Sequence, residues 1–403
     1  MTTASGIFKQ VAYKVESVYG TVPAAASAQS LRRVTSSIDL SKDTYQSNEI
    51  RTDFQVADFR HGVRRVGGSV SGELSAKTYA DFMAAALKKD FVATTAVTGA
   101  SITIAGSGPT YTVTRAAGDF LTGGFKVGDV IRLSVGTFNA LNINKNLLIV
   151  TLTATVATVI TLNGTAMFAE GPIASSTVTV FGKKSIVPQT GHTDKSFSIE
   201  HWYSDASASE VFSGCKVSKI GIGLPPTGMA TCNVEFVGKD ATAAGAQYFT
   251  SPTAVPTTGN MAAVNGVLRV AGATVANVTG LSIDIACGQS GEPVVGSNTV
   301  PFQAAGRVQV SGQITATFDS VTLRDAFYNE TEISLIGVFT ADNTAASDFI
   351  GFSMSRIKVG GASKDDGEKT ITQTIPFTAL LNTAGGAALA NDMTTISIQD
   401  SAA

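Results

Sequence analysis

A repeated order of short segments constrains this chain more than any other feature of its sequence. Four segments of the first half return in the same order in the second half. The matches are 34–40 (VTSSIDL) with 278–285 (VTGLSIDI), 70–74 (VSGEL) with 310–314 (VSGQI), 78–83 (TYADFM) with 322–327 (TLRDAF), and 216–237 with 352–377. Because the order is kept, we interpret the chain as a duplication of one unit: strand, long loop, strand, helix and hairpin.

Most of the chain has the pattern of β-strands. Thr, Val, Ile and Ser alternate over short runs that are separated by Gly, Asn or Pro. The clearest predicted strands are Lys216–Leu224, Ala230–Val237, Val308–Thr317 and Lys369–Phe377. Apolar residues at helical spacing predict one helix at Ser75–Lys89 and a shorter one at Val321–Asn329. The expected fold is therefore mainly β.

One block breaks the repeat. Residues 94–183 have at least five strand-like runs and no equivalent in the second half. We expect a small inserted β domain on an exposed side, because surface loops tolerate insertions of this size. The predicted domains are a first module at 1–93 and 184–245, the insert at 94–183, and a second module with a C-terminal tail at 246–403.

The composition limits the possible partners. The chain has 403 residues, of which 44% are hydrophobic and 15% charged, and its net charge is −2. A chain with so much apolar material is not disordered. So few charges favour a protein that covers its faces with copies of itself, and a balanced charge gives no electrostatic grip on nucleic acid or anionic lipid. No signal peptide and no apolar run long enough to span a membrane is found, so we expect synthesis in the cytoplasm and no membrane partner.

No motif for catalysis or for a cofactor is found. Gly106-Ser107-Gly108 lacks the lysine and helix of a phosphate-binding loop, and the three histidines lie far apart in the sequence. The preferred interpretation of His201 is a surface side chain at the end of a strand, and that of Asp365 and Asp366 is a solvated turn. Cys215, Cys232 and Cys287 have no metal-site spacing and are expected to be reduced core residues. We therefore predict no enzyme activity, no cofactor and no metal; a β-sandwich hydrolase or lyase would need converging carboxylates or a nucleophile with its base.

The segment from Lys42 to Arg65 has a different character. It is the most charge-dense stretch of the chain, yet it contains several apolar residues. Charges of both signs among aromatic residues are typical of an ordered protein–protein contact. A plain structural loop and a nucleic-acid contact through Arg64 and Arg65 are the alternatives. The candidate contact residues are Tyr45, Ile50, Phe54, Val56, Asp58, Phe59 and Arg60.

With these segments in view, the chain resembles the tail tube (major tail) proteins of long-tailed bacteriophages. The resemblance rests on VAYKVESVYGTVP near the N-terminus, on the segment LRRVTSSIDLSKDTYQSNEIRTDFQVADFRHGVRRVGGSVSGELS, and on VFSGCKVSKIGIGLPPTGMATCNVEFVGKD; it covers about residues 1–95 and 181–395. It implies β-sandwich or barrel modules, each with one helix, that join into rings, and rings that stack into a hollow tube. The long loop, here 42–65, then reaches the neighbouring ring.

The resemblance also implies the biological setting. A single-module member of the family forms six-subunit rings, so a two-module chain would form trimeric, pseudo-hexameric rings. Double-stranded DNA would pass without specific binding through a lumen free of aromatic and arginine clusters; Glu73, Glu235 and Asp284 are the residues we expect to face it. The implied partners are further copies of the chain and the tail terminator, tape measure and distal tail proteins, with assembly in the host cytoplasm and a final place in the virion tail. The alternatives are a secreted Thr/Gly-rich β adhesin or surface-layer protein, and a contractile or secretion-system tube protein.

Overall fold

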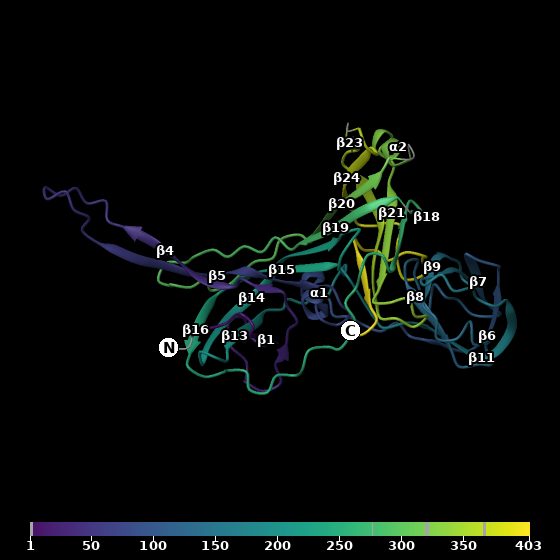
Figure 1. The fold of residues 1–403 in the computed structure, drawn as a ribbon, viewed down its shortest axis with the longest axis horizontal. Coiled ribbons are helices and arrows are strands. Elements are labelled where there is room, and N and C mark those ends of the chain that lie inside the picture. The colour runs from purple at the N-terminus through teal and green to yellow at the C-terminus, as the bar shows by residue number, and fades with distance from the viewer. Residues whose placement is uncertain (1–2, 276, 319–321, 366–367) are drawn as a thin grey trace.

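The computed structural model describes residues 3–275, 277–318, 322–365 and 368–403 and is mainly β, as the sequence predicts (Figure 1). The two helices of the described residues are α1 (Ala80–Leu87) and α2 (Thr322–Tyr328). Both are shorter than predicted, and Val321 lies outside the described residues. The predicted helix at 75–89 begins only at Ala80, because Ser75 forms a β-bridge with Asn260 and residues 76–79 form a turn.

An eight-stranded antiparallel sheet forms the centre of the molecule. It is built from two sets of strands that pair in the same order. The first set is β4 (Asp39–Gln46) with its short extension β3 (Thr35–Ser36), β5 (Phe59–Glu73), β15 (Thr231–Gly238) and β14 (Ala208–Leu224). The second set is β19 (Val278–Ala286), β20 (Gln309–Thr317), β24 (Thr372–Ala379) and β22 (Phe349–Val359), which β23 (Ser363–Lys364) extends.

The two long strands β14 and β22 each belong to two sheets. The first half of β14 pairs with two strands of an outer sheet and its second half with β15; β22 does the same with a second outer sheet and β24. The first outer sheet contains β1 (Lys9–Val15), β2 (Gln29–Ser30), β13 (Phe197–Tyr203) and β16 (Asp240–Ala244). The second contains β17 (Gly266–Val270), β18 (Ala273–Thr274), β21 (Ile333–Thr340), β25 (Ser397–Asp400) and β12 (Lys183–Ile186).

The core lies between the central sheet and these outer sheets. Alternate residues of the central strands point into it, and a directly opposed row across five strands is buried: Val70, Val234, Ile220, Ile285 and Val310. Helix α1 is buried along all of its length except Asp81. All three cysteines are free and buried, as predicted, and burial raises the pKa of the Cys287 thiol to about 11.

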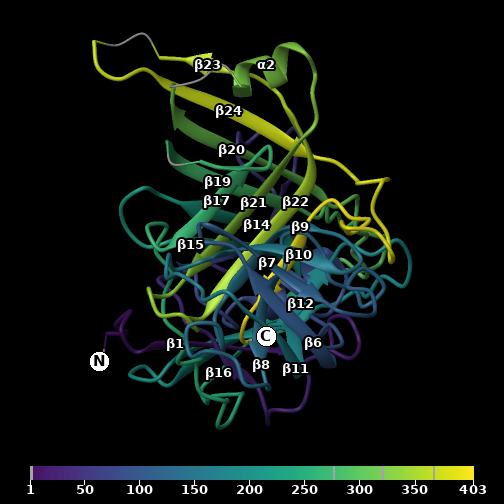
Figure 2. The same ribbon diagram turned by 90° about the vertical axis from the view of Figure 1, so that its right-hand side faces the viewer.

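The inserted block forms a closed barrel of six strands, which lies at the opposite end of the molecule from β4 (Figure 1) and faces the viewer in Figure 2. Its strands are β6 (Val97–Ala105), β7 (Thr110–Arg115), β8 (Val130–Ser134), β9 (Leu147–Leu152), β10 (Val156–Thr161) and β11 (Glu170–Val180). The barrel has its own apolar core but shares a second cluster with β21 and β22, in which Val130 and Leu148 pack with Ile336 and Phe349. The barrel is therefore seated on the second outer sheet, against β21 and the first half of β22.

His201 is not the surface residue that the sequence suggested. It lies in the middle of β13 with 1% of its surface exposed, and its Nε2 is 2.7 Å from the hydroxyl oxygen of Ser36. Burial lowers the pKa of His201 to about 3, so the ring is neutral. Ser36 is 165 residues away in the sequence. The environment of His201 is therefore set by strand packing that no local pattern contains.

Candidate assembly surfaces

The two strand sets meet along β14 and β19. Residues 219–224 of β14 pair with residues 286–281 of β19 in one antiparallel ladder, so the central sheet continues from one set into the other without a break. On the polar face, Lys219 and Asp284 form an ion pair of 3.1 Å across this junction. Both side chains are close to 40% exposed, so the junction contributes charges to an open surface.

The face of the central sheet that points away from the core is rich in hydroxyl groups and glycine. One row of opposed residues crosses all eight strands: Thr35, Ser71, Asn233, Gly221, Asp284, Ser311, Thr378 and Lys358. The rows on either side add further Ser, Thr and Gln. In the part of the sheet where all eight strands lie side by side, no aromatic side chain of the described residues belongs to this face; Phe59 lies on it farther out, in the extension of β5 beyond the other strands.

The three residues that we expect to face a lumen all lie on this polar face. Glu73 is opposite Thr231, Glu235 is opposite Lys219, and Asp284 lies in the central row. Glu73 also accepts a hydrogen bond from the side-chain amide of Asn260. The structure thus brings the three carboxylates to one surface; that this surface lines a channel remains a prediction.

Both edges of the central sheet are unpaired over much of their length. One edge is β4 with β3, which pairs only with β5. The other edge is the end of β22 and its extension β23, which pair with β24 on one side; beyond Ile357, no described strand pairs on the other side. Open edges of this kind recruit another chain unless they are blunted by charge, proline or a bulge.

The segment 42–65 is a two-stranded ribbon rather than the long loop that the sequence suggested. β4 pairs with β5 as far as Gln46 opposite Phe59, and the Ser47 amide donates one further hydrogen bond of 2.9 Å to the Asp58 carbonyl; residues 48–57 form the tip. This arm projects far from the body of the molecule (Figure 1). At its base, the residues between β19 and β20 run beside it, and the Arg64 amide donates a hydrogen bond of 2.8 Å to the Asn298 carbonyl.

The candidate contact residues are all on this arm and none is buried. Ile50 and Phe54 are fully exposed at the tip, and more than half of the surface of each of the other apolar candidates is exposed: Tyr45, Val56 and Phe59. Asp58 and Arg60 form an ion pair of 2.7 Å, which lowers the pKa of Asp58. An arm that displays its aromatic residues to solvent has no fold-stabilising use for them within one chain.

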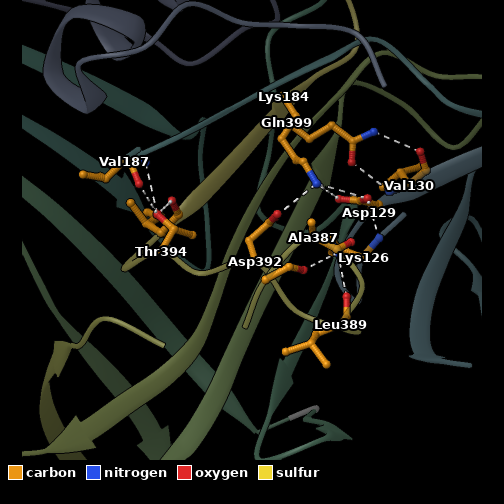
Figure 3. A network of polar contacts seen from close by, with 12 residues as sticks. Lys126, Asp129, Val130, Lys184, Val187, Ala387, Leu389, Asp392, Thr394 and Gln399 are labelled. Atoms are coloured by element: carbon orange, nitrogen blue, oxygen red, sulfur yellow. Dashed lines mark hydrogen bonds and ion pairs between the residues drawn. The ribbon is translucent and has the colours of Figure 1, made fainter. Parts of the chain in front are cut away.

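A buried charge network holds the inserted barrel in place (Figure 3). Lys184 lies between Asp129 of the barrel, at 3.0 Å, and Asp392 of the C-terminal segment, at 3.1 Å. Burial opposes a charge on Lys184, but the two carboxylates raise its pKa above the ordinary value. Lys126 donates hydrogen bonds to the carbonyls of residues 386, 387 and 389, and Gln399 bonds to both backbone groups of Val130.

The described residues contain no group of three or more His, Cys, Asp or Glu side chains that could hold a metal ion. None of their helices is long and apolar enough to cross a membrane. The surfaces described above are the polar face, the two open edges and the exposed arm; of these, the edges and the arm present unpaired strands and exposed apolar side chains.

Comparison with known proteins shows the family of the chain. No protein of curated function matches the chain in sequence. The family model described as "Phage tail tube protein" matches residues 9–379, which is most of the chain and includes both strand sets and the insert. The chain therefore belongs to the phage tail tube protein family.

Proposed function

We propose that this chain is the structural subunit of a tail tube whose rings close through the two open edges of the central sheet. The observation that carries the proposal is the junction of β14 with β19, where one strand set already continues into the next. A chain that joins two sets internally can join further copies externally with the same strands. Repetition around an axis closes a ring and satisfies both edges.

Each chain supplies two of the modules in this proposal. The first module comprises 1–93 and 184–245, the second 246–403, and the insert 94–183 lies outside the ring. Three copies then give six modules, which matches the pseudo-hexameric ring that the family resemblance implies. The polar face is on the inside, because the opposite face is already covered by the outer sheets and by α1.

The polar face suits the passage of double-stranded DNA. Hydroxyl groups and glycine offer neither stacking platforms nor a cluster of positive charges, so a passing duplex is not held. Glu73, Glu235 and Asp284 add repulsion toward phosphates. The assembled tube is then a conduit for genome ejection and has no catalytic role. It assembles in the host cytoplasm and becomes part of the virion tail. Its other partners are the tail terminator, tape measure and distal tail proteins.

The arm is the proposed contact between stacked rings. It projects from the sheet along the direction of its strands, and its exposed Ile50 and Phe54 supply apolar area for burial against a second ring. Negative-stain electron microscopy of the purified protein tests the function directly. Rings or tubes with a central hole are the expected result. A compact particle that never polymerises, even when concentrated, would favour a binding module such as an adhesin.

A further inference from the structure

The two strand sets can be aligned residue by residue from their pairing alone. The strands β14 and β22 both have an irregularity at the same place: Cys215 and Phe212 lie opposite Phe197 and Ile199, and Ile357 and Met354 lie opposite Ile333 and Leu335. Cys215 therefore corresponds to Ile357, and each residue of β14 to the residue 142 positions later.

The remaining strands give a consistent alignment. Gly221 then corresponds to Ser363, and their ladder partners Asn233 and Thr374 correspond as well. Asn233 lies opposite Ser71 of β5 and Thr374 lies opposite Thr315 of β20, so Ser71 corresponds to Thr315. Ser71 in turn lies opposite Thr35 and Thr315 opposite Gly280, so Thr35 corresponds to Gly280. Asp39 thus corresponds to Asp284, and Lys42 to Cys287.

The internal junction then predicts the register of the external one. Within the chain, Gly221 lies opposite Asp284. The equivalent residues at the two free edges are Ser363 on β23 and Asp39 on β4. Both are exposed in the single chain.

This register also tilts the strands as a closed barrel requires. The row that starts at Ser71 passes through Asn233 and Gly221 and reaches Asp284. The residue that corresponds to Asp284 in the first set is Asp39. Asp39 lies opposite Gly67, which is four residues from Ser71 along β5. Each set of four strands therefore shifts the register by four residues. With about 3.3 Å per residue and about 4.8 Å between strands, the tilt is roughly 35°, the value at which barrels close.

The segment that follows β19 packs against the last turn of α1, and α2 has no such neighbour among the described residues. The thiol of Cys287, just after β19, lies 3.6 Å from the carbonyl of Ala86 in the last turn of α1. On α2, by contrast, Phe327 and Tyr328 are 37% and 69% exposed. Between α2 and the free end of β22 is an open pocket of about 410 Å³, lined by Ala326, Phe327, Tyr328, Glu330, Thr331, Lys358 and Val359.

We propose that this pocket and the β22–β23 edge are the socket for the β3–β4 edge of a second copy of the chain, in the register of the internal junction. Lys42 of the second copy takes the position of Cys287, at the last turn of α2. There its ammonium group meets Glu330, whose side chain is 84% exposed and whose nearest cation is 3.8 Å away on Lys358. A lysine at this place also complements the C-terminal end of the helix dipole.

The proposal rests on the proposed ring and names its contacts, so the test must separate the two. The variant Asp39→Cys/Ser363→Cys places one cysteine on each free edge. Under mild oxidation of assembled protein we expect covalent ladders of linked chains on a non-reducing gel. The three native thiols do not compete, since all are buried.

The matched control is Thr35→Cys/Lys358→Cys. These two exposed residues end the same eight-strand row, so they meet only if the eight strands close with no net shift, whereas the proposed register shifts them by four residues per set and by eight over both sets. Links in the first variant alone support the socket. Links in the control alone, or in neither variant while tubes still form, overturn the register and leave the tube function standing. Failure of the wild-type chain to assemble would contradict the tube function, and the socket with it.

Charge reversal gives a second, independent test. Lys42→Glu or Glu330→Lys alone should weaken ring formation roughly two- to five-fold for each interface, which is the range of an exposed ion pair. The double variant Lys42→Glu/Glu330→Lys should restore it. Equal losses in the single variants that simply add in the double variant would contradict the pairing of these two residues.

Discussion

Lys219 and Asp284 face each other across the junction of the two strand sets, 3.1 Å apart, on the polar face of a sheet that continues on both sides. The pair joins β14, a strand of the first set, to β19, the first strand of the second. It shows that the two strand sets are already joined within one chain. In our account, the contacts between chains repeat it.

The arm gives the first prediction. Phe54→Asp, at the fully exposed tip, should leave rings intact and prevent their stacking, because a charge cannot be buried between rings at low cost. Electron microscopy should show single rings in place of tubes. Phe168→Asp is the matched control, since Phe168 is also exposed but lies in the inserted barrel. Tubes of normal length from Phe54→Asp or Phe59→Asp would remove the arm from the inter-ring contact.

The charge network under the barrel gives the second prediction. Lys184→Met keeps most of the side-chain volume but leaves Asp129 and Asp392 without their cation. We expect the free energy of unfolding to fall by about 3–5 kcal/mol, the usual cost of breaking a buried ion pair. Urea denaturation followed by fluorescence measures it. Lys183→Met, at the exposed neighbouring position, should change stability by less than about 0.5 kcal/mol.

The C-terminal strand gives a prediction on pH. Burial raises the pKa of Asp400 to about 6, although its carboxylate accepts hydrogen bonds from the Lys77 and Ala402 amides. An unfolded aspartate loses its proton near pH 3.9, so between about pH 4 and 6 the unfolded chain binds fewer protons than the folded one. Stability due to Asp400 should therefore decline by up to about 3 kcal/mol over this range and stay level above it.

Asp400→Asn should remove this decline, because the amide does not titrate. The measurement is the difference in unfolding free energy between the wild-type and variant chains from pH 4 to 8. A difference that is constant over the whole range would show that Asp400 ionises normally in the folded chain.

The polar face gives the fourth prediction. Asn233→Arg and Ser311→Arg place a cation in the middle of the hydroxyl-rich row, on strands of different sets. If this face lines the channel, preassembled tubes of the variants should gain affinity for short DNA duplexes, and the gain should fall as salt increases. Val135→Arg, exposed on the inserted barrel, is the control for DNA bound to the outside. Equal binding by all three variants would place the polar face elsewhere.

Local patterns in the sequence predicted the strands of the central sheet well. β15, β20 and β24 begin within three residues of their predicted starts, because their alternation reflects one buried and one open face. The burial of Cys232 follows from the same alternation.

Features set by distant partners could not be predicted. The pairing of β4 with β5 was missed because the arm has exposed apolar residues on a ribbon with no core to give it a clear alternation. The burial of His201 depends on Ser36, and that of Lys184 on Asp129, 55 residues away in the inserted barrel. The sequence shows that Lys184 is charged, but it does not show that folding places Asp129 beside it.

The mass of the assembled ring, measured by light scattering beside electron microscopy, shows how many chains close one ring. We expect a ring with a hole and three times the mass of one chain, because each chain supplies two adjacent modules. A ring of six chains would keep the tube but contradict the pairing of two modules per chain. A monomer that does not polymerise on concentration would contradict the tube itself.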